Sequence, residues 1–223
     1  MARVQQRIAA ACVRSGRDPD GIDLLPITKG VQVDRLREAV ALGLTEFGEN
    51  RVADAEAKAA EAKDVRWQLV GHLQSNKARR AVELFEVIQS VDSISIAERL
   101  SRHATDNMAR GPLPVLVQVN VDRDPAKHGF DPDALAAAIG RLADLDGLFL
   151  TGLMTVGRMV ARPEDARPTF RALRELSERL CRLEPRLGSG LSMGMSDDFE
   201  VALEEGATCV RIGRALFGER PPG

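Results

Sequence analysis

Short apolar runs alternate with amphipathic stretches along this chain. The N-terminal stretch repeats apolar residues at the spacing of one helical face, at Val4, Ile8, Ala11 and Cys12. This spacing predicts a helix that ends before the turn-forming residues 18–21. Eight short apolar runs follow and predict strands at 24–28, 45–48, 67–70, 87–91, 115–120, 149–154, 190–192 and 209–212.

The segments between these runs have helical periodicity, with charged residues on the face opposite the apolar one. Examples are Val52, Ala55, Ala59, Ala62; Leu135, Ala138, Ile139, Leu142; and Phe170, Leu173, Leu176, Leu180, Leu183. Strands separated by crossover helices pair in parallel, so the pattern predicts an α/β (β/α)8 TIM barrel with a preceding N-terminal helix. An open doubly wound sheet is the alternative. We expect residues 1–223, of which 44% are apolar, to form one barrel domain.

Composition points to small-molecule partners. The 31 basic and 33 acidic residues are interleaved, and no strongly basic stretch favours nucleic-acid binding. No segment has the length and apolarity of a signal peptide core or a membrane span. Three widely spaced cysteines do not form a disulfide or zinc pattern and fit a reducing cytoplasm. We expect a cytoplasmic monomer that binds neither membrane nor nucleic acid.

Lys29 is the first candidate for chemistry, because it lies at the end of the first predicted strand. In a closed barrel the first strand neighbours the eighth, whose end carries the turn at 211–214. An amine there can form an imine with an aldehyde, and we expect partial burial to favour its neutral form. A solvated surface lysine is the alternative.

Two glycine-bearing turns, at 192–196 and 211–214, are candidates for a phosphate site. Barrels commonly bind phosphate in the loops after the seventh and eighth strands. Gly213 allows close backbone approach, the N–H groups of Gly213 and Arg214 can point at an anion, and Ser192 can add a hydroxyl. The alternative is that the glycines only make tight turns and that Ser196 caps the next helix.

Arg211 ends the eighth predicted strand. If it faces a pyridine nitrogen, its permanent charge disfavours protonation of that nitrogen and weakens the cofactor as an electron sink. The alternative is an ordinary ion pair at a strand end.

Other polar residues give weaker signals. Asn50 can touch a ligand after the second strand or cap the following helix. His72, His103 and His128 are scattered without the paired spacing of metal ligands, so we expect no metal site.

Seven segments together resemble the pyridoxal 5'-phosphate homeostasis protein family, also called proline synthetase co-transcribed homologues. In chain order they are Thr28-Lys29, Phe47-Gly48-Glu49-Asn50, Gly71-His72-Leu73-Gln74-Ser75-Asn76-Lys77, Lys127-His128-Gly129, Gly152-Leu153-Met154-Thr155, Leu191-Ser192-Met193-Gly194-Met195-Ser196-Asp197-Asp198-Phe199-Glu200 and Arg211-Ile212-Gly213. The match extends in order over nearly the whole chain. It implies a barrel like the N-terminal domain of alanine racemase.

The resemblance also implies roles for individual residues in binding pyridoxal 5'-phosphate. Lys29 is the implied Schiff-base lysine, and Arg211 faces the ring nitrogen. The remaining implied contacts are Ser192, Gly213 and Arg214 at the phosphate, and Asn50 and Met154 near the ring. Gly30 and Arg214 depart from the family pattern, which usually has threonine at both positions.

The resemblance implies a protein that buffers and delivers pyridoxal phosphate, with apo enzymes as possible recipients and without robust turnover. The chain contains no tyrosine, so a lysine/tyrosine two-base racemase mechanism cannot operate. It also ends at Gly223, where we expect no second domain to complete such a site. We therefore expect no catalytic residues. A weak racemase or lyase and a cofactor-free Schiff-base aldolase are the alternatives.

Overall fold

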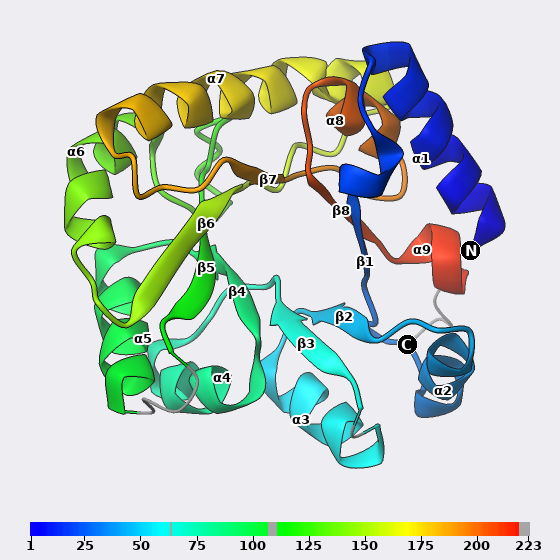
Figure 1. The fold of residues 1–223 in the computed structure, drawn as a ribbon, viewed down its shortest axis with the longest axis horizontal. Helices are drawn as coiled ribbons and strands as arrows, with labels where there is room; N and C mark the ends of the chain where they lie inside the picture. The colour runs from blue at the N-terminus through cyan, green and yellow to red at the C-terminus, as the bar shows by residue number, and fades with distance from the viewer. Residues whose placement is uncertain (63, 107–110, 219–223) are drawn as a thin grey trace.

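The computed structural model describes residues 1–62, 64–106 and 111–218, and within them eight parallel strands form one sheet. The strand order is β1-β8-β7-β6-β5-β4-β3-β2, and the helices surround the strands on the outside (Figure 1). The strands are β1 (Asp23–Pro26), β2 (Glu46–Glu49), β3 (Arg66–Leu69), β4 (Val87–Val91), β5 (Leu113–Gln118), β6 (Leu148–Met154), β7 (Gly190–Ser192) and β8 (Cys209–Ile212). The helices are α1 (Ala2–Ser15), α2 (Val33–Ala41), α3 (Val52–Glu61), α4 (Ala78–Leu84), α5 (Ile94–Asp106), α6 (Pro132–Ala143), α7 (Arg167–Leu183), α8 (Phe199–Glu204) and α9 (Arg214–Phe217).

The sheet closes between its first and second strands. An isolated parallel bridge joins Ile27 to Gly48, and the Thr28 N–H donates to the Gly48 carbonyl at 3.0 Å. On its other side β1 pairs with β8, with Pro26 opposite Ile212. The predicted (β/α)8 barrel is therefore confirmed, and the open doubly wound sheet is wrong.

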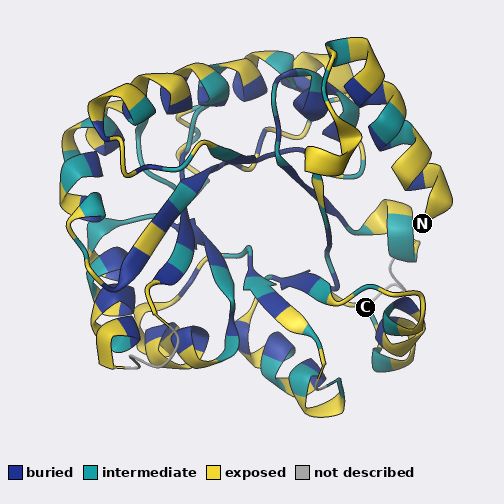
Figure 2. Cartoon of the chain, in the orientation of Figure 1, coloured by how far each residue is buried: buried dark blue, intermediate teal, exposed yellow. Residues whose placement is uncertain are grey.

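The helices bury the apolar faces that the sequence pattern predicts, and their outer faces are exposed (Figure 2). In α1 all four residues of the predicted stripe are buried. Arg7 fixes α1 to α8, because its guanidinium lies 4.5 Å from the centre of the Phe199 ring and pairs with Glu200. Leu183 departs from the pattern and is exposed, because it is the last residue of α7.

Each predicted strand is present, with ends shifted by at most two residues. β5 is shifted by two residues at both ends, since it begins at Leu113 and ends at Gln118. Asn120 leaves the strand because its side chain bonds to the backbone of Asp124 in both directions, which favours a turn.

Among the described residues, no helix combines the length and apolarity needed to cross a membrane. Cys12, Cys181 and Cys209 are all free thiols. Burial raises the pKa of the Cys12 and Cys209 thiols, so both are held in the unreactive protonated form.

Candidate functional site

A cleft of about 470 Å³ opens at the carboxyl ends of the strands. In a parallel barrel this end is formed by the strand-to-helix loops, so residues after β1, β2 and β8 meet there. Five of the predicted site residues line the cleft: Lys29, Asn50, Arg211, Gly213 and Arg214. Met154 and Ser192 do not line it, because both are fully buried at the ends of β6 and β7.

Lys29 follows β1 at the point where the barrel closes. The Ile27 N–H donates to the Ile212 carbonyl at 2.9 Å, and the adjacent Thr28 is fully buried. Gly30 has φ of +72°, a left-handed conformation that glycine adopts without steric cost. Lys29 itself is an exposed residue in this structure, and the partial burial of its amine stays a prediction. The fold therefore fixes the backbone immediately before Lys29, through the hydrogen bonds of Ile27 and Thr28 to neighbouring strands.

A second lysine, which the sequence analysis missed, holds the residue before Lys29. The Lys58 side chain, only 10% exposed, reaches inward from α3, and its ammonium donates to the Thr28 carbonyl at 2.5 Å and pairs with Glu49. Thr28 Oγ1 donates to the same carboxylate at 2.6 Å. The sequence does contain a signal for this buried lysine, because Lys58 is a charged residue within the apolar stripe of α3, between Ala55 and Ala59.

Arg211 is buried at the end of β8, with 5% of its surface exposed. Its guanidinium donates to Ser192 Oγ and to the Thr155 carbonyl, both at 2.7 Å, instead of forming the alternative strand-end ion pair. Burial lowers the pKa of Arg211, and the nearby Asp198 carboxylate partly offsets this effect. The guanidinium is therefore held rigidly, and Arg211 is a buried charged residue among those that line the cleft.

Ser192 belongs to a hydrogen-bonded chain through the barrel interior. Its hydroxyl donates to Gln89 Oε1 at 2.6 Å while it accepts from Arg211, and Gln89 Nε2 donates to Gln68 Oε1 at 2.5 Å. All of the hydroxyl's bonds are therefore made inside the barrel. The direct effect of the Ser192 hydroxyl is to orient Arg211.

Ser196, in the same turn, does line the cleft. Its Oγ accepts the Ala215 N–H at 3.2 Å and so ties this turn to the first turn of α9. The expected alternative that Ser196 caps the next helix is wrong, because Asp198 occupies the N-cap position of α8. Asp198 Oδ1 instead accepts the Met195 N–H at 2.7 Å, and burial raises the pKa of this carboxyl group.

Two further predicted site residues, Arg214 and Asn50, also line the cleft. Arg214 forms an ion pair with Asp197, another lining residue. Asn50 does not cap α3, whose N-cap is Arg51, and its backbone lies against Gly71. A Cβ at Gly71 would meet the Asn50 carbonyl oxygen at 2.3 Å, so glycine is needed for this close approach.

Comparison with known proteins agrees with this arrangement. Residues 27–221 match the model of the alanine racemase N-terminal domain family. A pyridoxal phosphate homeostasis protein of Pseudomonas aeruginosa is 42% identical over 100% of this chain and 95% of its own. PipY of Synechococcus elongatus, solved with pyridoxal phosphate bound, superposes with a TM-score of 0.84 and 38% identity, over 96% of this chain and 100% of PipY.

An alanine racemase of Clostridium difficile shares the fold alone. Its TM-score is 0.75 at 12% identity, and the match covers 99% of this chain but 57% of the racemase. The rest of that enzyme lies outside the match.

Proposed function

Because this chain belongs to the pyridoxal phosphate homeostasis proteins and carries the alanine racemase N-terminal domain, we propose that it binds pyridoxal 5'-phosphate at the mouth of its barrel. Its function is to buffer this cofactor and deliver it to enzymes that need it. The proposal treats residues 1–223 as one cofactor-binding barrel. The observation that carries it is the meeting of an exposed amine, a buried guanidinium and the Gly213 turn in one cleft.

Lys29 is the residue that we assign to covalent attachment. When bound, the aldehyde of pyridoxal 5'-phosphate supplies an electrophilic carbon that condenses with an amine into a reducible covalent bond. The end of β1 orients the Lys29 amine, since Ile27 and Thr28 are both fixed by backbone hydrogen bonds to neighbouring strands. Asn50, which also lines the cleft, contacts the ring in this proposal.

We assign the phosphate to the turn that contains Gly213 and Arg214, with Ser196 as the hydroxyl that the cleft exposes. Ser192 contributes by holding Arg211. Met154 is fully buried, so its approach to the ring requires a side-chain movement. Pyridoxal 5'-phosphate is small enough to fit a cleft of about 470 Å³.

Arg211 is assigned to the ring nitrogen. A guanidinium fixed by Ser192 and Thr155 disfavours a second positive charge beside it, so that nitrogen stays unprotonated. An unprotonated ring is a weak electron sink, which favours storage of the cofactor over carbanion chemistry.

The test of cofactor binding is borohydride reduction followed by peptide mass mapping. The purified chain, loaded with pyridoxal 5'-phosphate, is expected to absorb in the near ultraviolet or visible and to carry the pyridoxyl label on Lys29. Lys29→Ala is expected to lose the label. Lys77→Ala is the matched control, because Lys77 is exposed outside the cleft, and it is expected to keep the label.

Two results would overturn this assignment. A label spread over other lysines, with none on Lys29, excludes the cleft as the attachment site. Absence of any label after saturation, together with trapping of a simple carbonyl substrate on Lys29, favours the cofactor-free aldolase instead.

The proposed carrier function also includes an oligomeric state, a location and a class of recipient. The chain acts as a monomer in the cytoplasm, consistent with its free cysteines, and its recipients are apo enzymes that use pyridoxal phosphate. It has no robust turnover of its own, because the sequence contains no tyrosine to serve as the second base of a racemase.

A further inference from the structure

Two histidines that are 56 positions apart in sequence meet on the opposite side of the barrel mouth from Lys29. His72 follows β3 and His128 lies in the loop after β5, and their rings stack with centroids 3.8 Å apart and planes 9° apart. Asp92, directly after β4, completes the group. One ligand atom from each of the three residues lies within 4.8 Å of the other two.

The carboxylate of Asp92 is the centre of this group. His72 Nδ1 lies 2.6 Å from Asp92 Oδ2, and His128 Nδ1 lies 3.9 Å from the same oxygen. The Asp92 side chain is only 7% exposed, and among the described residues no lysine or arginine forms an ion pair with it. A nearly buried carboxylate normally needs a compensating cation.

The backbone at both histidines is fixed. Ser90 Oγ of β4 donates to the Gly71 carbonyl at 2.7 Å, next to His72. Gln118 Nε2 of β5 donates to the His128 carbonyl at 3.0 Å, and a Cβ on the following Gly129 would meet Asn120 N at 2.7 Å. The backbone at both histidines is therefore anchored to strand residues, while the two imidazole side chains can still turn.

We propose that His72, Asp92 and His128 form a second site, which binds a first-row divalent cation such as Zn²⁺. Two imidazole nitrogens and one carboxylate oxygen are a donor set that Zn²⁺ favours, with bonds of about 2.0–2.2 Å. Such bonds place donor atoms roughly 3–3.5 Å apart. The separations of 2.6 and 3.9 Å lie on either side of that range. Because an imidazole nitrogen binds a metal in the plane of its ring, the two stacked rings must turn until both face one ion, and their side chains are exposed enough to do so.

The site leaves one side open to solvent, since the His72 and His128 side chains are 41% and 59% exposed. Three protein ligands with an open position allow water or a small anion to complete the coordination. The neighbouring cleft is linked to this site through Gly71, which packs on the Asn50 backbone.

The test is calorimetric titration of the tag-free, chelator-treated chain with Zn²⁺. The parent is expected to bind one ion per chain. His72→Phe and His128→Phe each keep a ring for stacking but lose the nitrogen ligands, and Asp92→Asn loses the charge. Each is expected to weaken binding by at least about tenfold, because even outer-shell partners of a metal site are worth 10–100-fold.

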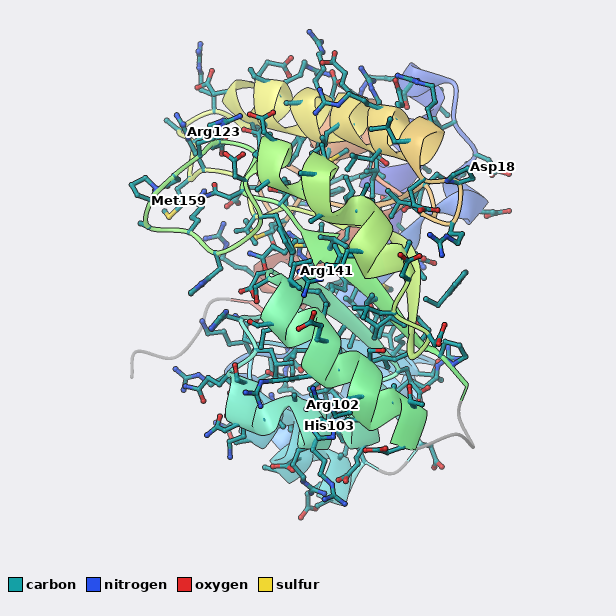
Figure 3. All side chains as sticks on the ribbon, turned by 90° about the vertical axis from the view of Figure 1, so that its left-hand side faces the viewer. Asp18, Arg102, His103, Arg123, Arg141 and Met159 are labelled. Carbon is teal, nitrogen blue, oxygen red and sulfur yellow. The ribbon has the colours of Figure 1, made fainter. Side chains whose placement is uncertain are left out.

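His103→Phe is the matched control, because His103 lies on α5, outside the cluster (Figure 3). It is expected to bind as the parent does, and so is Lys29→Ala, since the inference does not depend on the cofactor. Circular dichroism checks that each variant is folded. The proposal is overturned if the parent binds no Zn²⁺, if the two cluster histidine variants bind as well as His103→Phe, or if Lys29→Ala abolishes binding.

Discussion

Ser192 and Ser196 occupy one short turn but face different surroundings. The Ser192 hydroxyl is fully buried and bonded to Gln89 and Arg211, whereas Ser196 lines the cleft beside the first turn of α9. A ligand in the cleft can reach only Ser196 without displacing the interior chain of hydrogen bonds. In the proposed function the two serines therefore have separate roles: Ser196 contacts the phosphate and Ser192 positions Arg211.

Ser196→Ala is expected to lower affinity for pyridoxal 5'-phosphate by roughly 10- to 150-fold, since a hydrogen bond to a charged group is worth about 1.5–3 kcal/mol. Affinity for pyridoxal, which lacks the phosphate, is expected to be unchanged. Fluorescence titration with both ligands measures the difference. Ser192→Ala is the comparison and is expected to weaken both ligands equally, so an equal loss in Ser196→Ala would contradict the phosphate contact.

At the scale of elements, α3 does more than cover the barrel. Lys58 lies on the buried face of α3 and places its ammonium group beside Glu49, which is fully buried at the end of β2. The pair links α3, β2 and the end of β1 through Thr28. Removing one member leaves an uncompensated charge in the interior.

Lys58→Met is expected to reduce the free energy of unfolding by about 3–5 kcal/mol, the cost of breaking a buried ion pair. Urea unfolding measures it. Lys77→Met, at an exposed position, is the control and is expected to change stability by less than about 0.5 kcal/mol. Removing both charges in Lys58→Met with Glu49→Leu is expected to recover much of the loss, and no recovery would show that packing rather than charge dominates.

A second ion-pair group joins α7 to α8. Arg167 and Arg171 bond to Glu205 Oε1 at 3.0 and 3.2 Å, and Arg174 lies 3.2 Å from Oε2. The three arginines follow a spacing that places them on one face of α7. Burial by itself raises the pKa of Glu205, but the guanidinium groups outweigh it and lower that pKa overall.

A carboxyl group whose pKa is lowered by folding stabilises the native state above its unfolded pKa of about 4.3. This contribution is lost as pH falls through the folded pKa. Glu205→Gln is therefore expected to cost about 1.5–3 kcal/mol at pH 7, with a difference from the parent that shrinks below about pH 4. Unfolding curves over this pH range measure it.

Glu178→Gln is the control for Glu205, because Glu178 is 57% exposed and pairs with the same Arg174 at 3.8 Å. Its effect is expected to stay below about 1 kcal/mol, as for other exposed ion pairs. A difference between parent and Glu205→Gln that is constant from pH 7 to pH 3 would exclude an electrostatic origin.

At the scale of the molecule, the barrel gathers the lysine proposed for attachment and the turn proposed for the phosphate, without a second acid or base from tyrosine. General acid/base help typically contributes ~10²–10⁴-fold, so we expect racemisation far below ordinary enzyme rates of ~1–10³ s⁻¹. The loaded chain is instead expected to restore the activity of an apo pyridoxal-phosphate enzyme.

Cofactor transfer is measured as the activity of the recipient enzyme after mixing. Racemisation is measured by chiral analysis of alanine and serine incubated with the isolated chain. Lys29→Ala, treated with the cofactor and then desalted, is expected to restore no activity. Rapid racemisation by the isolated chain would reject the carrier function and favour the enzyme alternative.

The sequence by itself determined the barrel, its strand positions and most of the cleft. Alternating periods of two and 3.6 residues define strands and crossover helices locally, and parallel strands bring all their carboxyl ends to one edge. Lys29, Asn50 and the Gly213 turn follow strand ends, so topology alone directs them to the same mouth. The family motifs then identified the cofactor.

Tertiary structure decided which side chains face the cleft and which long-range pairs form. Ser192 ends β7 with its hydroxyl inside the barrel, whereas Ser196 lies after the strand and lines the cleft, and the sequence of this turn does not show that difference. Lys58 lies in an apolar stripe, and His72 and His128 are far apart in sequence, so their partners depend on strand order and register. Periodicity records which face of an element is buried, but it does not record which residue of another element lies opposite.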